Sequence, residues 1–492
     1  MNRVKNFLIQ LHNLTGTFLS LMFVVWFLSG FVLIFCGFPH ASREERFLNL
    51  SSITQADFDA IQNPLASFKG RIELEKIGDQ PVYRIYKGRK NQNVYNAYTL
   101  KPTPEMTEGE AVHLAEQFNR AKVKQVKVMK DLDQWMPWSY YRPLLPIFKC
   151  YLNDSKHTQL YISSKTGSIL QETTRSKRWA ARLGAIPHWV YFTSLRLKTG
   201  LWLKVVTWLS SFGVFVCLTG IIAGFIRLRK RKKHQTWTDF SPYKKFWHKW
   251  HHITGFFFGL FVFTFILSGL ISVTDIPSWM VPVHAKQSPS KQWNQKLELN
   301  EHLNYSPKEI WTAQKNKKDI RKIVWKTVMD QSSLFVYRND YQVPEVYICG
   351  KDSIYKREKY CEQEIKAWAN RVFCNHNYTL TSIKEYNNYY QKSGMRSRPL
   401  PAWQIDLNDK DDYRLYLDPT TGETIASYNN NDRARRWLYR ALHTFNLEVF
   451  KKHEWLRKLL LILASLGGLI VSLSGLVLSV RWLKRNYKQK LL

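Results

Sequence analysis

Four histidines occupy matching positions in the two halves of this 492-residue chain. His12 and His251 lie 239 residues apart, and His188 and His443 lie 255 residues apart. Neutral imidazole is a common metal ligand, and an ionisable side chain beside a membrane span tends to be kept for a function. A single histidine in such a place is more often just a hydrogen-bonded interfacial residue. Because both pairs keep their register, we favour the ligand interpretation for all four.

The register of the histidines belongs to a longer internal repeat. Two dipeptides that follow His12 recur after His251 at the same spacing: Thr15-Gly16 with Thr254-Gly255, and Ser29-Gly30 with Ser268-Gly269. At 255 residues, matches run without a gap from Leu152 to Gly220. One dipeptide can match by chance, whereas a register held over such a length indicates a duplicated element.

Four apolar segments have the length of about 20 residues that a helix needs to cross a bilayer. They cover residues 7–35, 201–226, 253–273 and 459–480. The first is too long for a cleaved signal peptide, and no A-x-A site follows it. We predict seven segments in chain order: helix 1 (1–37), an outward region (38–200), helix 2 (201–228), a basic loop (229–247), helix 3 (248–275), a second outward region (276–456), and helix 4 with a basic tail (457–492).

The orientation follows from Lys and Arg close to the membrane ends. Nine of them lie between residues 227 and 249, and five follow residue 480. This pattern places both termini and the short loop in the cytoplasm and both long regions outside. The chain has a net charge of +35, but its clustered charge lies beside apolar spans, where lipid and topology explain it. We therefore exclude nucleic acid as a partner and expect a lipid bilayer.

Each outward region shows the pattern of a small α+β module. In the first, the capping box Thr107-x-x-Glu110 opens a predicted helix over 108–121, and strands follow at 123–128, 148–152, 159–162 and 168–171. In the second, helices are expected at 306–314 and 359–373, with strands at 320–328, 334–337, 379–385, 403–407 and 414–417. Gly167 and the stretch from Asp418 to Glu423 are the expected turns.

Cysteines and aromatic residues add two observations. Cys349 is able to pair with Cys361 or Cys374, while the last two lie near opposite ends of one predicted helix and are too far apart to pair. The stretch from Trp135 to Arg142 is an aromatic cluster that we expect to be exposed, either as a headgroup-level belt or as a ligand contact.

Several of these motifs together resemble the PepSY-associated transmembrane proteins. The first span begins L-H-x-x-x-G and ends Ser-Gly, which here are Leu11 to Gly16 and Ser29-Gly30. A second span ends with Thr219-Gly220. The second outward module closes on D-P-x-T-G-E, here Asp418 to Glu423. The resemblance covers all four spans and both modules. The first module departs from it, because Ser163-Ser164-Lys165 stands where Asp-Pro is usual.

Within that family, the chain is most similar to the inner-membrane ferric-siderophore reductases of Gram-negative bacteria. The resemblance implies a membrane α-helical plus α+β fold, with four transmembrane helices in two repeats and a periplasmic PepSY-like module of helix and antiparallel strands in each. It further implies haem b between the helices, and electron transfer to a ferric siderophore or other iron chelate outside. No nucleotide-binding motif is present, so the electron donor is a separate, unidentified molecule.

A haem that is not covalently attached needs axial ligands in an apolar cleft. We assign His12 with His251 to one haem near the cytoplasmic face, and His188 with His443 to a second haem near the outer face. His252 is the alternative to His251, since it is adjacent and points about 100° away on a helix. For His40, His248 and His284, we favour an ordinary hydrogen-bonded role.

A second function class stays open at this point. The alternative interpretation is a non-enzymatic membrane protein whose two outward modules bind a peptide, a protease or a transport partner. Haem content separates the two interpretations.

Overall fold

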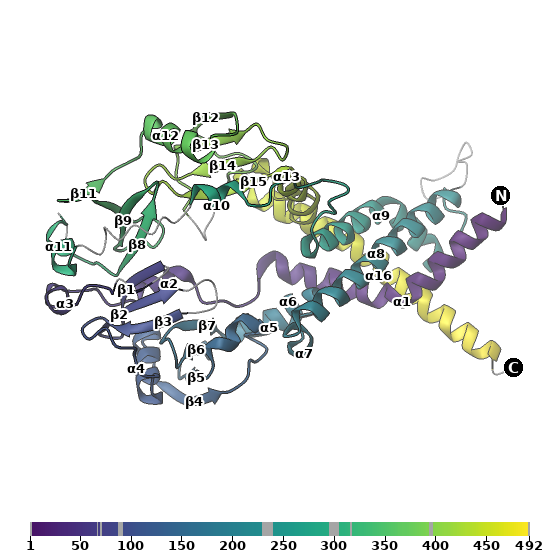
Figure 1. The fold of residues 1–492 in the computed structure, drawn as a ribbon. Helices are drawn as coiled ribbons and strands as arrows, with labels where there is room; N and C mark the ends of the chain where they lie inside the picture. The colour runs from purple at the N-terminus through teal and green to yellow at the C-terminus, as the bar shows by residue number, and fades with distance from the viewer. Residues whose placement is uncertain are drawn as a thin grey trace. The chain divides into compact units, whose positions relative to one another are not determined.

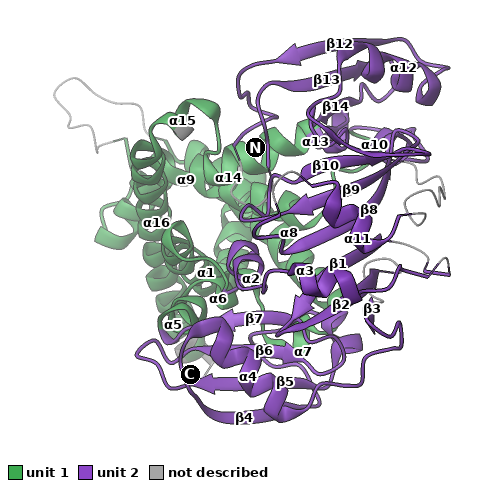
Figure 2. Ribbon diagram, turned by 90° about the vertical axis from the view of Figure 1, so that its left-hand side faces the viewer, with its two compact units in different colours: residues 1–38, 176–280, 433–492 green, residues 39–175, 281–432 purple. Residues whose placement is uncertain are grey.

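The computed structural model describes residues 2–65, 67–68, 71–86, 92–228, 240–294, 305–314, 317–392 and 397–490. These residues form two compact units, shown in different colours in Figure 2. Unit 1 contains residues 1–38, 176–280 and 433–492, and unit 2 contains residues 39–175 and 281–432. Each unit is therefore assembled from segments of both halves of the chain.

Unit 1 is built on four long helices, α1 (Asn2–Phe35), α8 (Thr199–Ile226), α9 (Phe246–Val273) and α16 (Glu454–Lys490). Among the described residues, these four are the helices long and apolar enough to cross a membrane. The prediction of four spans is thus confirmed. Most of the predicted basic loop, residues 229–239, lies outside the described residues.

The four helices pack as a bundle (Figure 1). Helix α1 packs against α8 and α16, and α9 packs against the same two. Glycines permit close approach on α16, because a Cβ atom at Gly467 or Gly468 would overlap the ring of Phe258 or Phe27. The two helices that carry His12 and His251 thus lie at opposite corners of the bundle.

Unit 1 also contains short helices from the ends of the two predicted outward regions. Before α8 lie α5 (Arg175–Leu183), α6 (Ala185–Trp189) and α7 (Thr193–Arg196). Before α16 lie α13 (Asn430–Arg435), a π-helical turn (Arg436–Ala441), α14 (Leu442–Thr444) and α15 (Glu448–Lys452). Helix α6 packs on α1, and α14 packs on α9, so each short segment meets the first helix of its own repeat.

Unit 2 holds the predicted antiparallel strands in three sheets. One four-stranded sheet has the order β4 (Val123–Met129), β5 (Ile147–Leu152), β6 (Gln159–Ser163), β7 (Ile169–Thr173). The second four-stranded sheet has the order β12 (Tyr378–Ile383), β13 (Ala402–Leu407), β14 (Arg414–Leu417), β15 (Thr424–Tyr428). The capping box at Thr107 and Glu110 opens α4 (Glu108–Asn119) as predicted. Gly167 and Gly422 have positive φ in the expected turns.

The third sheet has seven strands and draws on both halves of the chain. Its order is β11 (Ile354–Arg357), β10 (Glu345–Cys349), β9 (Gln331–Tyr337), β8 (Lys322–Val328), β1 (Arg71–Ile77), β2 (Gln80–Tyr86), β3 (Gln92–Asn96). The antiparallel pairing of β1 with β8 joins the halves. The sequence did not predict β1 to β3, β10 and β11 in this sheet, nor β15 in the second four-stranded sheet. The pairing of β1 with β8 joins segments about 250 residues apart in the chain and therefore leaves no local pattern.

Further helices in unit 2 are α2 (Arg43–Leu48), α3 (Gln55–Ala60), α10 (Pro289–Trp293), α11 (Pro307–Thr312) and α12 (Glu362–Val372). Cys361 caps α12 and Cys374 lies beyond its end, and all six cysteines are free thiols. The expected exposure of the aromatic cluster is wrong for Trp135 and Met136, which are buried in the core, while Tyr140 is exposed.

Candidate functional site

The structure brings His12 and His251 together. Their ring centres are 6.3 Å apart, and the ring planes are tilted by 22°. The Nδ1 atom of His12 lies 3.2 Å from the carbonyl oxygen of Val216 on α8, and that of His251 lies 3.2 Å from the carbonyl oxygen of Val471 on α16. Each ring is thus anchored to the second helix of its own repeat and faces its mate from the other repeat.

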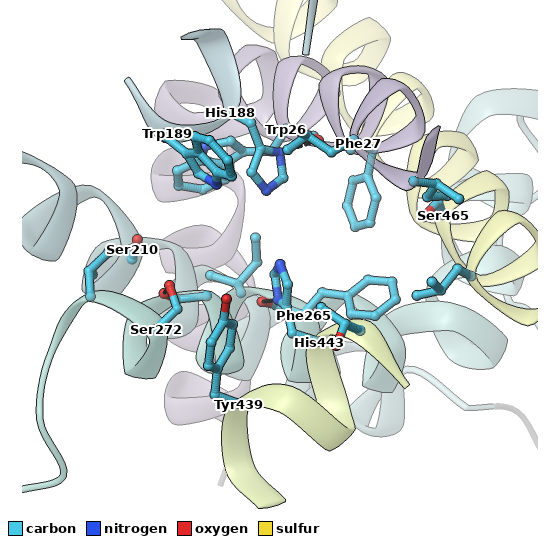
Figure 3. Close-up of a pocket in the computed structure, with 18 of the residues that line it drawn as sticks. Trp26, Phe27, His188, Trp189, Ser210, Phe265, Ser272, Tyr439, His443 and Ser465 are labelled. Atoms are coloured by element: carbon cyan, nitrogen blue, oxygen red, sulfur yellow. Dashed lines mark hydrogen bonds between the residues drawn. The ribbon is translucent and has the colours of Figure 1, made fainter. Parts of the chain in front are cut away.

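The structure also brings His188 and His443 together. Their ring centres are 6.2 Å apart, with the planes at 65°. The Nδ1 atoms lie 3.1 Å from the carbonyl oxygens of Trp26 on α1 and Phe265 on α9, respectively. Figure 3 shows the two rings pointing toward each other from opposite walls of a cavity.

Breaks in the helical backbone set the position of this second pair. Gly184 separates α5 from α6 four residues before His188, and the π-helical turn ends two residues before His443. Two residues after each histidine, Val190 and Phe445 adopt left-handed backbone conformations with φ of 53° and 47°. Such conformations are costly for large side chains and are concentrated at functional sites.

The cavity around His188 and His443 has a volume of about 350 Å³, within the range of small-molecule sites. Aromatic and aliphatic side chains dominate its lining, which comes from all four long helices. Arg457 and Tyr439 line it as well. The sequence analysis missed these two residues, because nothing in their local pattern marks them as neighbours of a histidine.

Three other histidines that the sequence analysis weighed, His252, His284 and His40, lie outside these two pairs. His252 turns its Nε2 to the carbonyl oxygen of Gly224, at 3.0 Å, and its ring packs against Phe240 and Tyr243. It is therefore His251, and not its neighbour, that faces His12. In unit 2, His284 contacts Asp411 at 2.7 Å, and His40 is exposed.

The separation within each pair suits a shared metal atom. Two metal–imidazole bonds of about 2 Å, plus about 1 Å from each nitrogen to its ring centre, place the ring centres about 6 Å apart. Both pairs meet this requirement. Along α1, His12 and the Trp26 carbonyl that holds His188 are 14 residues apart, which is about 21 Å of helix. The bundle thus contains two separate histidine sites within the length of one span.

A family model described as the PepSY-associated TM region matches residues 10–328, more than half of the chain. The matched range contains His12, His188 and His251. A comparison with curated proteins gives no match. The four membrane-spanning helices and the extent of the family match show that this multi-pass membrane protein belongs to the PepSY-associated transmembrane family.

Proposed function

We propose that this protein transfers electrons across the bacterial inner membrane and reduces ferric siderophores or other ferric chelates outside it. His12 with His251, and His188 with His443, would each hold one haem b. The observation that carries the proposal is the spacing of about 6 Å between opposed imidazoles, which occurs twice in one bundle. Bound haem b supplies a one-electron carrier.

The residues around the second pair fit such a group. Apolar side chains such as Phe27 and Leu461 line the cavity and limit the access of water. Arg457 also lines the cavity, and a guanidinium is a strong hydrogen-bond partner for carboxylates such as those of haem. Its present partners are Glu454, through Nε at 2.8 Å, and the carbonyl oxygen of Thr444, at 3.0 Å.

The position of the two pairs fits a path through the membrane. With about 21 Å between them along α1, they divide a hydrocarbon core of about 30 Å into shorter intervals. The Lys and Arg pattern predicts that the first pair lies near the cytoplasm, where an electron donor would bind, and the second near the outer face. The ferric chelate would then meet the outer side of the protein.

The test uses full-length protein, expressed with ample haem and purified in detergent. We expect two haems per chain and absorption bands that change on reduction with dithionite. His12→Ala and His251→Ala should each abolish the same haem, and His188→Ala and His443→Ala the other. All four variants should still insert, because the apolar length of the spans is unchanged.

Two outcomes would overturn the proposal. If the wild-type protein binds no haem, electron transfer by haem fails, and a role in binding a peptide or protein partner takes its place. If all four variants keep the haem content and spectrum of the wild type, the ligands lie elsewhere.

A separate experiment tests the substrate class: the dithionite-reduced protein should reduce a ferric chelate.

A further inference from the structure

Each of the four histidines contacts the same pair of groups on a neighbouring helix, a backbone carbonyl and a side-chain hydroxyl. Its Nδ1 lies 3.1–3.2 Å from a backbone carbonyl oxygen, and it also faces a Ser or Thr hydroxyl three residues further along that helix. The carbonyl and hydroxyl residues are Val216 and Thr219 for His12, Trp26 and Ser29 for His188, Val471 and Ser474 for His251, and Phe265 and Ser268 for His443.

The carbonyl fixes the tautomer of each ring. A carbonyl oxygen only accepts hydrogen bonds, so the Nδ1 beside it carries the proton. The lone pair of the neutral imidazole is then left on Nε2. This is the tautomer in which Nε2 can bind a metal, and the protein selects it four times with backbone atoms.

The hydroxyl adds a second acceptor for the same proton. Ser29 donates its own hydrogen to the carbonyl oxygen of Val25 at 2.6 Å, and its oxygen lies 3.1 Å from Nδ1 of His188. Ser474 likewise donates to Val471, at 2.9 Å, and faces Nδ1 of His251 at 2.9 Å. Donation by a hydroxyl polarises its oxygen and makes it a better acceptor.

A glycine follows the hydroxyl residue in every case. A Cβ atom at Gly220 would lie 2.7 Å from Cε1 of His12, and one at Gly475 would lie 3.2 Å from Cε1 of His251. At Gly30 and Gly269 the corresponding distances to His188 and His443 are 3.7 and 3.6 Å. The missing side chain lets the rings of His12 and His251 lie against the helix backbone, most tightly at His12, whereas a Cβ atom at Gly30 or Gly269 would make ordinary van der Waals contact.

We propose that these four Ser/Thr-Gly dipeptides are positioning elements that direct Nε2 of each histidine at the metal and tune its donor strength. We call them the histidine seats: residues 29–30, 219–220, 268–269 and 474–475. This inference rests on the proposed haem sites. A stronger acceptor on Nδ1–H makes Nε2 more basic, so the seat hydroxyls stabilise the oxidised iron and strengthen binding.

A purely structural role is the competing explanation, because serines in membrane helices commonly donate to their own backbone. The chain offers matched controls for it. Ser20 on α1 and Ser472 on α16 are also buried and bonded to their own helices, through the carbonyl oxygens of Thr17 and Gly468. Neither is a seat residue.

The experiment compares Ser29→Ala and Ser474→Ala with Ser20→Ala and Ser472→Ala in the full-length protein. Haem is titrated into protein prepared without it, and the reduction potential of each haem is measured by spectroelectrochemistry. Removal of a seat hydroxyl should weaken haem binding about 10- to 100-fold at its own pair and raise that haem's potential. The other pair should be unaffected, and Ser29→Thr and Ser474→Thr should restore both values.

The proposed role of the histidine seats is wrong if the seat variants match the control variants in both haem affinity and reduction potential. It is also wrong if the threonine variants do not recover the wild-type affinity and potential. That result leaves the proposed function intact, because the wild type would still bind two haems. A wild type without haem would instead remove the proposed function and the seats together.

Discussion

At the scale of single residues, the histidine pairs lie against glycines, which have no side chain. Each glycine of the histidine seats lies inside a long helix, and its helical backbone conformation does not require glycine. At Gly220, where a Cβ atom would lie 2.7 Å from the ring of His12, what requires glycine is the imidazole of a histidine on another helix. Glycine costs about 1 kcal/mol relative to alanine inside a helix, so its use here indicates that close approach of the ring matters more than helix propensity.

Gly220→Ala should therefore disturb the His12–His251 pair. The new methyl group would overlap the His12 ring, whose Nδ1 is anchored to the carbonyl oxygen of Val216 on the same helix as Gly220. We expect loss of most haem from this pair and retention of the other haem, measured as haem per protein and by the reduced-minus-oxidised spectrum. Gly224→Ala is the control, since it lies one turn further along α8 and its Cβ would meet no atom within 4 Å. Equal effects of the two variants would argue against close approach.

At the scale of elements, the seven-stranded sheet of unit 2 has two different faces. Ile72 and Leu74 of β1 point into an apolar core. On the other face, Glu75 is buried and makes ion pairs with Arg84 on β2 at 2.8 Å and Lys322 on β8 at 2.5 Å. The pair with Lys322 crosses the junction of β1 with β8, at which the two halves of the chain meet, whereas the pair with Arg84 lies within the first half.

This junction should weaken in acid. Burial opposes ionisation of Glu75, but the cations of Lys322 and Arg84 outweigh it and lower its pKa to about 2. A lowered folded-state pKa gives stability that is present above the normal value near 4.5 and is lost as pH falls toward 2. Glu75→Gln should cost about 3–5 kcal/mol at neutral pH.

The measurement is thermal unfolding of the full-length protein in detergent between pH 7 and pH 3. The difference between wild type and Glu75→Gln should shrink as pH falls below 4.5, because the unfolded wild type then takes up a proton at Glu75 that the folded state does not. Asp59→Asn removes an exposed pair with Lys308 and should cost less than about 1 kcal/mol. A difference that does not change with pH would contradict the assignment.

At the scale of the whole molecule, the distribution of Lys and Arg predicts the orientation. The dense basic residues at 227–249 should hold that loop in the cytoplasm. Reporter fusions after Lys232 should therefore give cytoplasmic signals. Fusions at Asn153 and Asn408, which are exposed in unit 2, should give periplasmic ones. The reverse pattern would place the His188–His443 pair on the donor side and remove the proposed direction of electron flow.

The sequence alone determined the features that repeat or that depend on composition. Four spans follow from apolar length, and the pairing of histidines follows from a register kept over the duplication. Seven strands of the two four-stranded sheets were also predicted, but not β15. The Ser/Thr-Gly dipeptides were visible as part of that repeat. Their relation to the histidines was not, because the interaction runs between different helices.

Only the tertiary structure decided which groups meet. It turned His251 rather than His252 toward His12, since the angle of about 100° between neighbouring helical residues becomes a direction only when the bundle is packed. It joined β1 to β8 across about 250 residues, and it brought Arg457 to the cavity of His188. Contacts of this kind are set by the packing of complete surfaces, and no short stretch of sequence records which surface a side chain will face.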